Sequence, residues 1–244
     1  MSSPSESPVT DPESEPKLCY LCLNPLTAPT NRDHIPALQF FAPGIRERYN
    51  LSELLTVEVH QQCNSSYERD EQYLVYTLLG FMRGSEAGDK LYKHILNKYR
   101  SGEAVGLIKK VLAEFEPQPG GIVLPGNRVL KRFDGERIRR VAWKIVRGLY
   151  FHRTGKLLPE NLTVAVTLTT QDERPPGHFI AFRDLPDNDE LGHYPGVFAY
   201  RFQVFPEVQN AQYWALLLWD RVILTVAFHD PGCTCADCQA KRAS

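Results

Sequence analysis

The chain has 244 residues, 43% of them apolar, and a formal net charge of −1 at pH 7. This length and composition allow one large core or two smaller ones, and no apolar stretch is long enough to cross a bilayer. A net charge so close to zero argues, taken alone, against a protein that binds nucleic acid through its charge. The N-terminus lacks the basic and apolar pattern of a secretory signal, so we expect a cytoplasmic protein with reduced cysteines.

Residues 1–16 are acidic and rich in serine and proline, which predicts a disordered tail. Residues 17–75 are rich in turn-forming residues and contain only short apolar runs, such as LLTVEV at residues 54–59. We expect small strands and loops there. A domain this small needs a staple, and a metal ion is the obvious candidate.

Three consecutive segments then place apolar side chains at helical spacing: residues 74–82, 91–99 and 105–115. Glycines separate the segments. The pattern predicts three amphipathic helices that pack on one another, and most of this region forms a helical extension at residues 76–116. The sequence EPQPGG at residues 116–121 predicts a linker.

The C-terminal region, residues 122–244, begins with a helical stripe from Ile138 to Leu149. Five apolar segments follow, each typical of a β-strand: residues 162–169, 178–182, 196–205, 213–219 and 222–228. We therefore predict an α+β fold made of a metal-stapled N-terminal domain, a helical extension and a C-terminal helix plus antiparallel sheet.

The cysteines indicate where metal binds. Cys19-x-x-Cys22 and His60-x-x-Cys63 have the same two-residue gap, and together they offer the four ligands of a structural Zn²⁺ site. The alternative is a set of small buried thiols with an unrelated histidine. A second set near the C-terminus comprises His229, Cys233, Cys235 and Cys238. It is either a second zinc site or a group of reduced thiols.

Asp33 and His34 lie between the two halves of the first set, in the sequence NRDHIP, and Asn64 follows Cys63 directly in HQQCN. With these motifs, residues 17–75 resemble the HNH endonucleases, the His-Me finger or ββα-metal group. The resemblance implies a ββα-metal domain that hydrolyses phosphodiester bonds of nucleic acid, here expected to be DNA. It also implies two kinds of metal, a structural Zn²⁺ and a catalytic Mg²⁺ or Mn²⁺.

The resemblance assigns roles to individual residues. His34 is the expected general base, and the oxygens of Asp33 and Asn64 suit a hard divalent ion on the other face of the strand. Glu68, one helical turn after Asn64, is either a third ligand or a solvated surface carboxylate. Glu53 stands where the family often has its middle asparagine, the residue that helps to orient the catalytic histidine.

A basic segment accompanies this motif. Residues 128–156 carry ten basic and two acidic side chains, a net charge of +8, which leaves −9 for the rest of the chain. Arg137, Arg140, Lys144 and Arg147 are spaced three or four residues apart, so they can line one helix face and contact phosphates. The alternative is a solvated charged face.

Three functions from different classes follow from these motifs. The first is a metal-dependent HNH endonuclease. The second is a zinc-stapled nucleic-acid-binding module without catalysis, and the third is a protein-interaction module. The sequence does not decide the oligomeric state, and a dimer is compatible with it.

Overall fold

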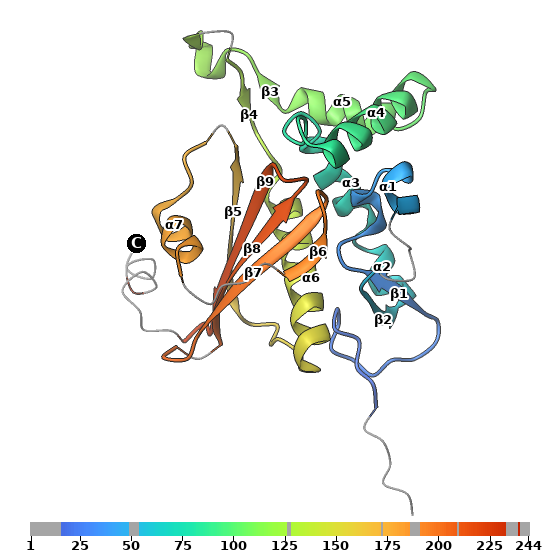
Figure 1. Cartoon of the computed structure of the whole chain (residues 1–244), viewed down its shortest axis with the longest axis vertical. Helices are drawn as coiled ribbons and strands as arrows, with labels where there is room; N and C mark the ends of the chain where they lie inside the picture. Colours follow the sequence, from blue (N-terminus) through green and yellow to red (C-terminus); the bar gives the residue numbers. More distant parts are fainter. Residues whose placement is uncertain are drawn as a thin grey trace, which may run out of the picture.

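The computed structural model describes residues 16–48, 54–125, 128–171, 173–185, 191–208, 210–232 and 239 (Figure 1). Residues 1–15, Glu53 and the three C-terminal cysteines lie outside this part, so the predictions for them stay predictions. The N-terminal elements are β1 (Thr30–His34), η1 (Leu38–Phe40), α1 (Pro43–Arg48), β2 (Thr56–His60), α2 (Gln61–Ser65) and α3 (Glu68–Thr77). β1 and β2 pair as an antiparallel hairpin, and α2 follows β2 without a gap.

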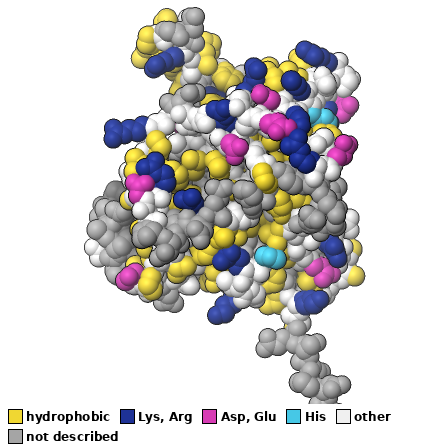
Figure 2. All heavy atoms as spheres, viewed as in Figure 1, with side chains coloured by type: hydrophobic (Ala, Val, Ile, Leu, Met, Phe, Trp, Pro, Cys, Tyr) yellow, Lys and Arg dark blue, Asp and Glu magenta, His cyan; other side chains and the backbone are white. Residues whose placement is uncertain are grey.

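The helices expected from apolar spacing are present as α3, α4 (Glu86–Arg100) and α5 (Val105–Ala113). The first of them differs from its expected range of 74–82, since α3 ends at Thr77 and residues 78–82 form turns. The segment expected as a linker is instead an arm in which β3 (Phe115–Glu116) pairs with β4 (Leu130–Lys131), with η3 (Pro119–Gly121) between them. Ion pairs that join Glu114 to Lys131 and Glu116 to Arg132 hold the two sides of the arm. Its outer part projects from the body and exposes apolar side chains (Figures 1 and 2).

The C-terminal elements are α6 (Gly135–Thr154), β5 (Thr163–Thr170), α7 (Gly177–Arg183), β6 (Leu191–Tyr194), β7 (Phe198–Phe205), β8 (Ala211–Leu218) and β9 (Val222–His229). The strands form one antiparallel sheet in the order β5-β9-β8-β7-β6. The predicted α+β class with an antiparallel sheet is therefore confirmed. Among the described residues, no helix combines the length and apolar character that crossing a membrane requires.

The segment at residues 178–182 was predicted to be a strand, and that prediction is wrong because it forms α7. A five-residue apolar run has too few positions to distinguish a helix from a strand by periodicity. Pro176 precedes the first helical residue, a place where proline is tolerated. Phe182 of α7 then packs against Tyr213 on the sheet, with ring centroids 4.8 Å apart.

α6 lies between the sheet and the N-terminal elements. Trp143 packs edge-on against Phe228 of β9, at a centroid distance of 5.1 Å, while α6 also packs along α3. A Cβ atom built on Gly148 would lie 2.2 Å from Cδ1 of Ile35, the residue after β1. Glycine at this position therefore lets the helix approach the β1–β2 hairpin closely.

We expect Gly148→Ala to lower the free energy of unfolding by about 1–3 kcal/mol, because the added methyl group overpacks the contact with Ile35. Gly106→Ala in α5 is the matched control, since the described structure places no neighbouring atom within 4 Å of its Cβ position. That control should instead stabilise the helix by about 0.5–1 kcal/mol. Urea unfolding measures both values, and equal shifts in the two variants would contradict the close approach of α6.

Candidate functional site

Four predicted zinc ligands come together at one end of the hairpin. Cys19 and Cys22 lie in a tight turn, closed by hydrogen bonds from Cys19 N–H to Asn24 O (2.9 Å) and from Leu23 N–H to Cys19 O (2.8 Å). His60 ends β2, and Cys63 lies in the first turn of α2. One ligand atom from each of the four residues lies within 4.8 Å of the others. The group can hold a zinc ion, as its sequence spacing predicts.

The chemistry of the four donors also suits Zn²⁺. Nδ1 of His60 lies 3.3 Å from Cys22 Sγ, and its Nε2 lies 3.1 Å from the carbonyl oxygen of Pro25. A proton on Nε2, donated to Pro25, leaves the Nδ1 lone pair facing the thiols. The N–H of Thr27 also lies 3.1 Å from Nε2 and would require the opposite tautomer. A zinc ion bound at Nδ1 would select the tautomer that donates to Pro25.

The thiols themselves favour a cation among them. Burial, then the hydrogen bond to Cys22 and the charge of Cys19, raises the pKa of the Cys63 thiol to about 12. Zinc binds cysteine as the thiolate, so a cation among the three sulfur atoms would offset the effects that raise the pKa of Cys63. A Cys3His set around Zn²⁺ supplies that ion and has no open coordination position, which is typical of a structural site.

Of the predicted second zinc set, the structure describes only His229. This residue ends β9, and its Nδ1 lies 2.7 Å from the carbonyl oxygen of Asp230. The three cysteines lie outside the described residues, so a second zinc site stays a prediction.

Asp33 of β1 is buried, with 2% of its surface exposed. Its Oδ2 accepts a hydrogen bond from the Tyr20 hydroxyl, and its Oδ1 accepts one from Lys144 Nζ at 2.8 Å. Tyr20 lies between the two cysteines of the turn, so that turn places a donor directly against the carboxylate. Each carboxylate oxygen of Asp33 therefore accepts a hydrogen bond from another side chain.

Lys144 of α6 lies in the middle of the predicted catalytic residues. Its side chain is buried, and its ammonium also donates to Asn64 Oδ1 at 3.2 Å and to Glu71 Oε1 at 2.5 Å. The sequence predicts a divalent ion bound to Asp33 and Asn64, at the position that the Lys144 ammonium group occupies. The arrangement of these residues fits an ammonium group and does not fit a divalent ion beside it.

Burial and the neighbouring charges shift the pKa of both Lys144 and Glu71. Burial lowers the pKa of Lys144, but the carboxylates of Asp33 and Glu71 more than offset it, so that the pKa lies above its ordinary value. Burial, with the nearby charge of Asp33, raises the pKa of Glu71. The cause is that two carboxylates share one ammonium group in a site with little water.

His34 opens onto a cavity of about 370 Å³. Asp33 lines the same cavity, although the sequence predicts that the two side chains lie on opposite faces of the strand. Arg46, Asn64, Glu68 and Glu71 also line it. Burial, and then the positive charges of Arg46 and Lys144, lower the pKa of His34 against the opposing effect of Asp33. A neutral imidazole at pH 7 follows, which a general base requires.

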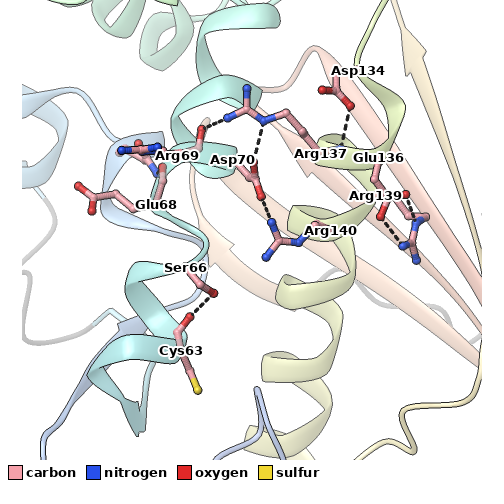
Figure 3. Close-up of polar contacts among 11 residues, drawn as sticks. Cys63, Ser66, Glu68, Arg69, Asp70, Asp134, Glu136, Arg137, Arg139 and Arg140 are labelled. Atoms are coloured by element: carbon pink, nitrogen blue, oxygen red, sulfur yellow. Dashed lines mark hydrogen bonds and ion pairs between the residues drawn. The ribbon is translucent and has the colours of Figure 1, made fainter.

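The four basic residues predicted to contact phosphates face the N-terminal elements. Arg137 and Arg140 reach from α6 to Asp70 of α3, and Figure 3 shows Glu68 pointing away from this contact. Lys144 is buried, and Arg147, also buried, donates to the carbonyl oxygen of Leu21 at 3.2 Å. The expectation that these four cations share a solvent-facing row is corrected. The sequence does not reveal Asp70 as the partner of Arg137 and Arg140, because it lies 67 and 70 residues away from them along the chain.

Sequence reasoning missed three residues of this site: Tyr20, Arg46 and Glu71. Glu71 carried a partial signal, since it lies seven residues after Asn64 and would share its face if one helix ran through both. The structure instead places Asn64 in α2 and Glu71 in α3. Tyr20 and Arg46 gave no local signal. The fold alone brings them to Asp33 and His34.

Comparison with known proteins adds no relative. No protein-family model, no curated protein and no solved structure matches the chain. The function therefore has to be inferred from the residues and their geometry.

We expect the purified chain to lose one zinc per molecule when Cys22 is replaced by serine, because a Cys3His site closes with four ligands. Elemental analysis by mass spectrometry measures the zinc content. His94→Ala in α4 is the control, since His94 lies outside the four-ligand group. An unchanged zinc content in Cys22→Ser would show that the group does not bind zinc.

Proposed function

We propose that the chain is an HNH-type endonuclease that hydrolyses phosphodiester bonds of nucleic acid, with DNA as the expected substrate. One observation carries this proposal. An antiparallel hairpin and the helix after it, joined by a group that can hold zinc, bring Asp33, His34 and Asn64 to a single cavity.

His34 has the chemistry that the first step needs. Hydrolysis requires a base to take a proton from water as the water attacks phosphorus. The half-buried imidazole of His34 opens onto the cavity, and its lowered pKa keeps it able to accept that proton. The guanidinium of Arg46 lines the same cavity and can neutralise the charge that develops on the phosphate.

Lys144 already binds two of the expected ligands of the catalytic metal ion. The resemblance implies Mg²⁺ or Mn²⁺ at Asp33 and Asn64, with Glu68 as a third ligand, but Lys144 donates to both Asp33 and Asn64. Glu68 is exposed at the edge of the cavity and remains available. Dependence on a divalent ion is therefore proposed as a property to be measured, alongside the structural Zn²⁺.

Contact with the nucleic-acid backbone is proposed for two of the four basic residues. The side chains of Arg137 and Arg140 keep 27% and 40% of their surface exposed while they bind Asp70. Lys144 and Arg147 are too buried to reach a phosphate in this arrangement. Binding through Arg137 and Arg140 would not depend on base sequence, since phosphate contacts carry none of that information.

A second candidate function is a zinc-stapled nucleic-acid-binding module without catalysis. The engagement of Asp33 and Asn64 by Lys144 favours it, because these two side chains are the expected ligands of the catalytic ion. This candidate predicts salt-dependent binding without cleavage.

A cleavage assay separates the two candidates. We expect the zinc-loaded chain to nick or cut supercoiled DNA with Mg²⁺ or Mn²⁺, and His34→Ala to lower the rate by about 10²–10⁴-fold while zinc content stays unchanged. His94→Ala is the matched control and should keep the full rate. RNA is assayed in parallel.

Two outcomes would count against the endonuclease. Equal rates for His34→Ala and wild type would show that His34 is not the base. Binding of DNA or RNA without cleavage, under every metal condition, would favour the non-catalytic module.

A further inference from the structure

We propose that Lys144 is a built-in cation of this site: its ammonium takes the place between Asp33, Asn64 and Glu71, and a divalent ion binds there only after Lys144 has left. The inference rests on the proposed function, because it concerns the ion that an HNH-type endonuclease would use. It deepens that function by naming what controls access of the ion.

Each hydrogen of the Lys144 ammonium group has one acceptor. Its Nζ lies 2.8 Å from Asp33 Oδ1, 2.5 Å from Glu71 Oε1 and 3.2 Å from Asn64 Oδ1. An ammonium group has three hydrogens to donate, so the three acceptors match it one for one. An exposed lysine would instead keep its charged end in water.

The remaining polar atoms of the three acceptors are engaged as well. Tyr20 donates to Asp33 Oδ2, and Gln39 Nε2 donates to Glu71 Oε2 at 3.1 Å. The amide nitrogen of Asn64 donates to Asn31 Oδ1 at 3.3 Å. Mg²⁺ requires oxygen ligands at about 2.0–2.1 Å in near-octahedral geometry. These oxygens cannot meet that requirement while Lys144 holds them.

The charge balance explains why an ion could still replace Lys144. Two carboxylates and one ammonium group carry a net charge of −1. Without Lys144 the same place carries −2, which a divalent ion neutralises in full. The lysine and the ion therefore compete for one set of oxygens. Only molecules in which Lys144 has left can bind the ion, so the apparent affinity equals the intrinsic affinity multiplied by the fraction of such molecules.

Lys131 offers a matched comparison within the same chain. Its side chain is also buried, with 5% exposed, and its Nζ lies 2.6 Å from Glu114 Oε2. Glu114 is a single carboxylate that also accepts hydrogen bonds from Tyr73 and Thr77. Removing the charge of Lys131 thus leaves one partly buried carboxylate but no group of ion ligands.

The test measures Mn²⁺ binding to the zinc-loaded full chain, with free Mn²⁺ counted by electron paramagnetic resonance. We expect wild type to bind Mn²⁺ weakly and Lys144→Met to bind it at least about tenfold more tightly, because the competing cation is gone. Lys131→Met should match wild type. Adding Asp33→Asn to Lys144→Met should remove the gain, which locates the bound ion at this place.

Equal Mn²⁺ affinity in Lys144→Met and wild type would overturn the proposal. Circular dichroism and zinc content check that each variant is folded. If Lys144→Met does not fold, the wild-type chain is tested alone. Its melting temperature should stay constant at micromolar Mn²⁺, because Lys144 keeps the ion out. A rise in the melting temperature would overturn the proposal. Cleavage is not read in this experiment. If Lys144→Met binds Mn²⁺ tightly but the separate cleavage assay finds no activity, that result counts against the endonuclease alone.

Discussion

The buried ion pairs between Lys144 and the carboxylates of Asp33 and Glu71 set the position of α6 against the N-terminal elements. A buried charge without a partner costs several kcal/mol, so α6 is restricted to positions in which this ammonium meets these carboxylates. Gly148, one turn further along α6, allows that position, since the helix can then approach Ile35 closely. The hairpin, α3 and the sheet consequently share one buried cluster, which extends from Cys19 to Phe228.

The same contacts explain how a nearly neutral chain contains a segment of net charge +8. Asp33, Asp70 and Glu71, all from the N-terminal elements, bind basic residues of α6. On the arm, Glu114 and Glu116 bind Lys131 and Arg132. The charge separation seen along the sequence is therefore largely cancelled within the fold. What remains for a partner is the exposed part of residues such as Arg137 and Arg140.

The parts of the structure that follow from short-range pattern could be predicted. The spacing of Cys19, Cys22, His60 and Cys63 indicated a four-ligand group, and apolar periodicity indicated α4 and α6. The place of Lys144 could not be predicted, because its partners are 73 and 111 residues away and a helical wheel shows only that it is polar. The helix α7 was missed for a different reason: its apolar run is too short to carry a period.

Tyr20 gives the turn between Cys19 and Cys22 a second effect. Its hydroxyl donates to Asp33 from a turn that backbone hydrogen bonds of Cys19 close and whose two cysteines belong to the four-ligand group. The four-ligand group and the buried carboxylate that binds Lys144 are thus joined through the side chain of Tyr20.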